Sequence, residues 1–177
     1  GGGTKEMTLR ASDAFKKNDV ELNILREHFL TIAMAKVSTS GYEAYDLGLF
    51  EKSKDVIITN RDEQLSIAKS YARVLADQGY VKPIERTDIK VLGKQALGMF
   101  MVGTDSMKAG NYISEYDLLM ADKLAYVMSG GDLSAATTVS ERYLLDIERE
   151  AFLSLCGQRK TLERIQHMLT TGKPLRN

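Results

Sequence analysis

The sequence predicts a mainly α-helical protein with at most one short strand. Three observations support this fold class. Residues that favour helices dominate the 177-residue chain, which contains only 2 Pro. Apolar residues recur with a period of about 3.6, which is the pattern of an amphipathic helix. Short polar motifs that are typical of helix starts precede several of these stretches.

Four polar motifs predict helix starts. Three of them have the pattern of a capping box, in which a polar side chain and a carboxylate satisfy free amides of the first turn. These three are Ser40–Glu43, Asn60–Glu63 and Thr138–Glu141. The fourth is Ser114, where Glu115 and Asp117 add negative charge at the positive end of a helix. We therefore expect a helix to begin at each motif.

Four apolar stripes are spaced for one face of a helix. They are Leu65, Ala68, Ala72 and Leu75; Leu92, Ala96, Met99 and Met107; Leu118, Ala121, Ala125 and Met128; and Leu144, Ile147, Ala151 and Leu155. Glycines end two of these helices, at Gly79 with Pro83 behind it and at the pair Gly130 and Gly131. The many methionines favour core packing, with an adaptable pocket or partner groove as the alternative.

One short strand is expected at 55–59, where Val56, Ile57 and Ile58 form a β-branched run. The best domain boundary is the stretch from Gly79 to Thr87, because Pro83 interrupts the helical pattern there. The sequence thus predicts one domain over residues 1–80 and a purely helical C-terminal domain over residues 84–177.

Composition argues against several functions. The chain has 24 basic and 24 acidic residues and a formal net charge of zero, whereas a nucleic-acid-binding protein needs a basic face. The single cysteine, Cys156, excludes an internal disulfide and a Cys-based zinc site. His28 and His167 lie in no metal-binding motif, so no metal site is expected. No apolar run is long enough to span a bilayer, and the lone cysteine favours a reducing, cytoplasmic location.

Three segments of the first half follow one another in an informative order. Gly2–Thr4 opens a helix, and Phe29–Ala35 lies on the next helix. Ser38–Leu49 then contains a serine-capped turn with Glu-Ala, followed by Gly-Leu. This order resembles that of the crotonases, the enoyl-CoA hydratase/isomerase family. In that family a short strand and a long helix come next.

The C-terminal part carries a second resemblance. Glu148–Leu155 and the ending with Lys173 and Pro174 resemble the last helices of the crotonases, which end in a basic-Pro motif. The amino-acid sequence of these two segments is similar to that of bacterial β-oxidation proteins in which a 3-hydroxyacyl-CoA dehydrogenase half precedes a crotonase-like half. The resemblance covers about residues 1–80 and 140–177. Residues 84–137 would be an extra helical stretch that simple crotonases lack.

The resemblance implies that the chain is the C-terminal fragment of a fatty-acid β-oxidation enzyme acting on acyl-CoA thioesters. The family's catalytic glutamates and oxyanion-hole amides precede the Gly-Gly-Thr turn, so no catalytic residue is expected within the chain and the fragment alone should be inactive. No cofactor is expected in the fragment, and NAD would bind the upstream half of the parent protein. Lys173 is the expected CoA-binding residue, as the partner of a phosphate. A solvated terminal tail is the equally weighted alternative for Lys173.

Two other functions remain open. The chain could be an independent helical interaction or oligomerisation module without catalysis, and crotonases themselves commonly form homo-oligomers. It could also be an unrelated enzyme that uses the acidic residues Asp146, Glu148 and Glu150 beside Arg142 and Arg149. Their helical spacing favours solvated ion pairs on one helix over an acid/base site.

Overall fold

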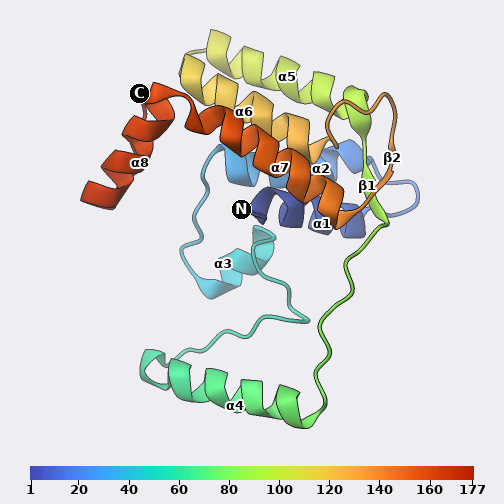
Figure 1. Ribbon diagram of the computed structural model, residues 1–177, viewed down its shortest axis with the longest axis vertical. Coiled ribbons are helices and arrows are strands. Elements are labelled where there is room, and N and C mark those ends of the chain that lie inside the picture. Colours follow the sequence, from blue (N-terminus) through green and yellow to red (C-terminus); the bar gives the residue numbers. More distant parts are fainter. The chain divides into compact units, whose positions relative to one another are not determined.

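The computed structural model describes residues 1–177 and confirms a mainly helical protein (Figure 1). It contains eight α-helices, one 3-10 helix and two short strands. The chain forms two compact units. The first unit combines Gly1–Lys36 with Arg86–Asn177, and the second unit is Val37–Glu85. None of the helices combines the length and the hydropathy that a transmembrane span requires.

The first unit holds both strands and six of the α-helices. Its elements are α1 (Gly3–Ala14), α2 (Glu21–Ala33), β1 (Ile89–Val91), α5 (Gly93–Ala109), α6 (Glu115–Met128), β2 (Thr137–Val139), α7 (Glu141–Cys156) and α8 (Arg159–Thr171). β1 and β2 pair antiparallel, with Ile89 opposite Val139 and Val91 opposite Thr137. Figure 1 shows α6 between α5 and α7, so α6 has helical neighbours on two sides.

The second unit contains α3 (Gly41–Asp46), the 3-10 turn η1 (Arg61–Glu63) and α4 (Gln64–Asp77). The strand predicted at 55–59 is wrong, because this segment is irregular and both strands of the protein lie in the first unit. A β-branched run becomes a strand only when a neighbouring strand takes up its backbone hydrogen bonds, and the second unit has no such neighbour. Instead, the Tyr45 hydroxyl donates to the Asp55 carbonyl at 2.7 Å. The protein has two short strands, where the sequence predicts at most one.

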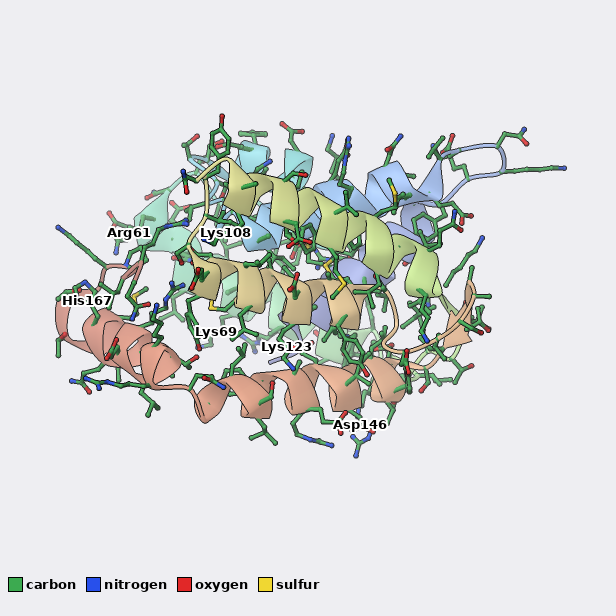
Figure 2. The ribbon with its side chains drawn as sticks, turned by 90° about the horizontal axis from the view of Figure 1, so that it is seen from above. Arg61, Lys69, Lys108, Lys123, Asp146 and His167 are labelled. Carbon is green, nitrogen blue, oxygen red and sulfur yellow. The ribbon has the colours of Figure 1, made fainter.

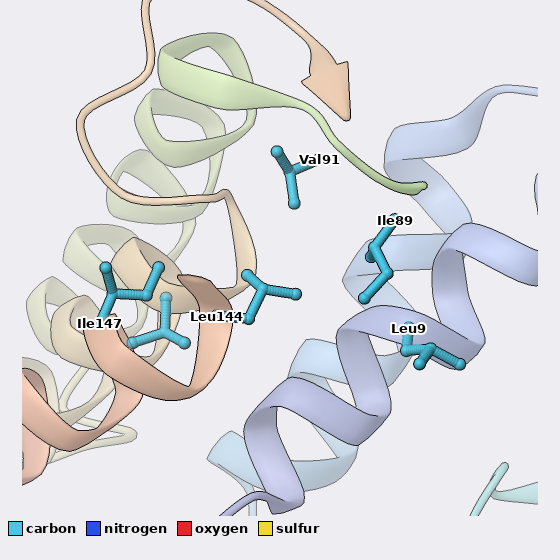
Figure 3. Close-up of a cluster of buried hydrophobic side chains, with 6 residues drawn as sticks. Leu9, Ile89, Val91, Leu144 and Ile147 are labelled. Carbon is cyan, nitrogen blue, oxygen red and sulfur yellow. The ribbon is translucent and has the colours of Figure 1, made fainter. Parts of the chain in front are cut away.

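The two units do not follow the predicted ranges 1–80 and 84–177. The change of unit after residue 85 lies close to the predicted boundary, but the first 36 residues pack with the C-terminal helices. The reason is a shared apolar core, drawn in Figure 3, whose buried members are Leu9, Ile89, Val91, Val127, Leu144 and Ile147. Full burial of such a side chain stabilises by roughly 1.5–3 kcal/mol. That residues 1–80 belong to a crotonase-like domain remains a prediction.

Capping side chains confirm most of the predicted helix starts. Side-chain caps are present at Ser40, Asn60 and Ser114, and the cap at Ser114 is a complete capping box with Asp117. The capping box predicted at Thr138–Glu141 is wrong, because the N-cap residue of α7 lies two residues after Thr138. Ser140 caps α7 by accepting from the Tyr143 N–H at 3.1 Å, whereas Thr138 lies in β2. Pairing with β1 keeps Thr138 extended, a long-range contact that a local motif does not contain.

Candidate binding pocket

A mostly apolar pocket of about 450 Å³ lies within the first unit. Three elements supply its walls, namely the start of α1, α6 from Met120 onward and most of α7. The lining residues are Gly1, Gly2, Thr4, Met120, Lys123, Leu124, Val127, Arg142, Leu145, Glu148, Arg149, Ala151, Phe152 and Leu155. The volume lies within the range typical of small-molecule sites, which are lined mainly by apolar side chains with a few polar groups.

The apolar lining comes from the facing sides of α6 and α7. Leu124 and Val127 are three residues apart on α6, and Leu145 and Phe152 are two turns apart on α7. Helical residues at these spacings share a face, so each helix presents a row of side chains to the pocket. Val127 is also part of the buried core, which holds this wall in place. Phe152 also lines the pocket and is 57% exposed.

Charged side chains also line the pocket. Lys123, Arg142 and Arg149 are basic, and Glu148 is the one acidic residue that lines the pocket. Figure 2 shows Lys123 on α6 where that helix faces α7, and Asp146 on the outer side of α7. The excess of basic groups makes the pocket suitable for a ligand that combines an apolar part with negative charge.

The acidic residues of α7 have two different roles. Asp146 pairs with Arg149 at 2.7 Å and with Arg142 at 3.9 Å, and all three side chains are between 45% and 69% exposed. This confirms the solvated helix pairs that the spacing favours, and such exposed pairs add little to stability. Glu148 departs from that interpretation, because its carboxylate binds the start of α1 instead of a basic side chain on α7.

Glu148 caps α1 from a distant part of the chain. One carboxylate oxygen accepts from the Gly2 N–H and the other accepts from the Lys5 N–H at 2.9 Å. Gly2 is the N-cap residue of α1 and has no side chain to cap the helix, and its φ of 111° lies in the left-handed region that favours glycine. The Lys5 amide is the third of the helix, which is one that an N-cap side chain normally binds. Glu148 therefore replaces the missing local cap.

A second contact joins α1 to α7 at the start of α7. The Lys5 Nζ lies 3.0 Å from carboxylate oxygens of both Glu6 and Glu141, and Glu141 also accepts from the Arg86 N–H at 3.0 Å. Burial acts to lower the pKa of Lys5, but the hydrogen bonds and charges of Glu141 and Glu6 outweigh it and raise that pKa. The Arg86 amide and the Lys5 ammonium lower the pKa of Glu141. The charged forms of both side chains thus stabilise this contact.

Lys173, the residue predicted to bind CoA, does not line this pocket. It is exposed and follows Gly172, which ends α8 with a φ of 68°. The Lys173 backbone N–H donates to the Thr171 hydroxyl at 3.1 Å. Its role in CoA binding therefore stays a prediction. The structure contains no group of three or more His, Cys, Asp or Glu side chains placed to hold a metal ion.

Sequence reasoning missed the pocket and its polar groups. Lys123 and Phe152 carry no motif, and Glu148 looked like one acid among several on α7. One signal was present: a helix start with three glycines and no capping side chain needs an acceptor from elsewhere. The sequence does not tell which of the distant carboxylates supplies it.

Comparison with known proteins finds one informative relative. All 177 residues align at 44% identity with a probable 3-hydroxyacyl-CoA dehydrogenase of Bacillus subtilis (strain 168). The aligned region is 22% of that protein, so the chain spans about a fifth of its relative's length. No family model matches the chain. No solved structure matches it either.

Proposed function

We propose that the chain is the C-terminal part of a 3-hydroxyacyl-CoA dehydrogenase protein that acts on acyl-CoA thioesters in fatty-acid β-oxidation. The observation that carries this proposal is the 44% identity, over the whole chain, to a probable 3-hydroxyacyl-CoA dehydrogenase. The resemblance of Gly2–Thr4 and Ser38–Leu49 to crotonases adds an enoyl-CoA hydratase-like domain to the proposal. NAD would bind the upstream half of the parent protein.

The pocket supports this proposal through its chemistry. A fatty acyl chain needs an apolar lining, which Leu124, Val127 and Leu145 offer. The phosphates of CoA need cations, and Lys123, Arg142 and Arg149 lie at the same site. Arginine binds phosphate through paired N–H groups, and lysine acts as a point charge.

Binding of acyl-CoA to the 177-residue chain tests the proposal. Isothermal titration calorimetry would compare free CoA, butyryl-CoA and octanoyl-CoA. We expect the affinity to rise with acyl length, since each buried methylene adds about 0.8 kcal/mol. Equal affinities for all three would show that the apolar lining is not used, and no binding of any of them would refute the proposed ligand.

Lys173 provides a test for the CoA end of the ligand. Lys173→Ala should weaken free CoA and octanoyl-CoA by the same factor, roughly threefold to tenfold, because a phosphate contact is independent of acyl length. The control is Lys160→Ala on α8. The Lys160 Nζ lies 5.7 Å from the centre of the Tyr116 ring, and Lys160 is not expected to contact a phosphate. Unchanged binding in Lys173→Ala would mean that Lys173 belongs to a solvated tail.

The chain alone should have neither hydratase nor dehydrogenase activity, because the family's catalytic glutamates and oxyanion-hole amides precede Gly2–Thr4. The hydratase part is measured by the loss of enoyl-thioester absorbance when the chain is mixed with crotonyl-CoA. Turnover would show that residues within this chain do the chemistry. The carboxylates of α7 would then become the leading candidates.

A non-catalytic interaction or oligomerisation module is the second candidate. The observation that favours it is the uncovered apolar row of α8, where Leu162 is 55% exposed, Ile165 42% and Leu169 78%. Large exposed apolar patches commonly mark interaction sites. The calorimetric titration with CoA distinguishes the two functions, since this candidate predicts a stable monomer or dimer that binds no CoA.

A further inference from the structure

We propose that Glu148 is a positioning residue that determines the shape of the pocket between α1, α6 and α7. Its carboxylate joins two pocket walls that come from opposite ends of the sequence. The inference needs the proposed function only to name the natural ligand, and the contacts that carry it are independent of that ligand.

The Glu148 carboxylate lies between two walls of the pocket. Glu148 lines the pocket from α7. Gly1 and Thr4, which precede the two donor residues Gly2 and Lys5, line it at the start of α1. The hydrogen bonds to the Gly2 and Lys5 amides therefore run between the two walls. A ligand in the pocket would contact the segment whose position this carboxylate sets.

Glu148 is the side chain that caps the N-terminus of α1, and within this segment the Thr8 hydroxyl donates to the Thr4 carbonyl at 2.9 Å. The start of α1 has no side-chain cap of its own, and Gly1 and Gly3 are exposed. Glycines have the largest backbone freedom of all residues, so an unheld glycine run would sample many conformations. Without the carboxylate, the wall formed by Gly1–Thr4 would lose its defined place.

Contacts that do not involve Glu148 hold the rest of α1 against α7. Farther along α1, Leu9 packs in the core with Leu144 and Ile147 of α7, and Lys5 binds Glu141. These contacts keep the two helices together when the segment Gly1–Thr4 is released. Loss of the carboxylate should thus change the pocket wall while the molecule stays folded.

The experiment compares Glu148→Gln with Glu150→Gln in the 177-residue chain. The two changes remove the same charge on the same helix, but Glu150 is exposed and lies outside the pocket. Glu148→Gln keeps the length of the side chain. It replaces one of the two acceptor oxygens by an N–H₂ group, so either the Gly2 or the Lys5 amide loses its acceptor. Circular dichroism and thermal unfolding would first establish that both variants are folded.

The readouts are amide and methyl NMR spectra with two probes, octanol and octanoyl-CoA. Octanol is an apolar probe that requires no CoA chemistry. In Glu148→Gln we expect faster hydrogen exchange at the Gly3–Lys5 amides and about tenfold weaker octanol binding, seen at the methyls of Leu124, Val127 and Leu145. Glu150→Gln should match the unmodified chain in both respects.

Several outcomes would overturn the inference. These are unchanged octanol affinity in Glu148→Gln, an equal effect in Glu150→Gln, or octanol that leaves the pocket methyls of the unmodified chain unshifted. The proposed function fails separately. If octanol binds and depends on Glu148 while octanoyl-CoA does not bind, the positioning role stands and the acyl-CoA ligand is refuted.

Discussion

At the scale of single residues, contacts with distant parts of the chain decide whether a glycine is required at a given position. Gly130 ends α6 with a φ of 91°, and a Cβ atom there would lie 2.5 Å from Val91 of β1. Glycine is therefore required twice, once for the backbone conformation and once for the approach of β1. Gly98, in the middle of α5, is exposed and has no heavy atom near its Cβ position.

These two glycines predict opposite effects of the same substitution. Gly130→Ala should lower the free energy of unfolding by about 1–3 kcal/mol, because a strained φ and a close contact both oppose the methyl group. Gly98→Ala should raise it by about 0.5–1 kcal/mol through helix propensity. Urea unfolding of both variants measures the difference. Similar values for the two would contradict the contact at Gly130.

Glu141 predicts how stability responds to pH. Its pKa in the folded protein is lowered from 4.5, so its stabilising contribution is complete above that value and is lost as the pH falls below it. The pKa of Lys5 is raised from 10.5, so the contribution of Lys5 is complete below that value and is lost as the pH rises above it. The contact between α1 and α7 should hold between these limits.

The matching variant is Glu141→Gln. We expect it to be less stable than the unmodified chain at neutral pH, with a difference that shrinks as the pH falls below 4.5. Thermal unfolding between pH 3 and pH 7 is the measurement, and Glu150→Gln is the control that should show no such convergence. A difference that stays constant across this range would show that the charge of Glu141 plays no part.

At the scale of elements, helices with similar apolar stripes differ in how many of those apolar side chains are buried. The four predicted apolar stripes lie on helices, except for Leu92, which is the N-cap residue of α5. α6 buries Ala121, Ala125 and Met128, whereas α4 buries nothing. α8 also has no buried residue, although it carries an apolar row. Polar contacts hold α8 instead, because Arg164 donates to Asp117 at 2.8 Å and its guanidinium lies 5.1 Å from the centre of the Tyr116 ring.

Arg164 should therefore be the main attachment of α8. In Arg164→Ala we expect faster hydrogen exchange and faster proteolysis within α8, with little change in α6. The guanidinium and Asp117 are only 15% and 13% exposed, so removing one partner leaves a poorly solvated charge. Arg159→Ala is the control, since its side chain is 92% exposed. Equal proteolysis of α8 in both variants would show that other contacts hold the helix.

At the scale of the whole molecule, the two units differ in how much they bury. The first unit contains the apolar core around Leu144 and Ile89, whereas Ala44 is the only buried residue between 37 and 85. Burial of apolar surface is the main source of stability, so the second unit must be the weaker one.

Hydrogen exchange measures this difference directly. Amides of α4 in the second unit should exchange orders of magnitude faster than amides of α6 in the first unit, because α4 opens without breaking an apolar core. Mass spectrometry of exchanged peptides would separate the two helices. Equal protection of α4 and α6 would mean that the second unit is stabilised by contacts beyond those of its own residues.

The sequence by itself determined the helical class, three of the four predicted helix starts and the helix ends at Gly79 and Gly130. These features depend on interactions within a turn or two, such as the cap at Ser114 or the period of an apolar stripe. The tertiary structure decided the pairing of β1 with β2, the grouping of Gly1–Lys36 with the C-terminal helices, and the pocket. The pocket depends on Glu148 meeting a helix start 143 residues away from it. Such contacts have no local signal, because their partners are brought together only when the core forms.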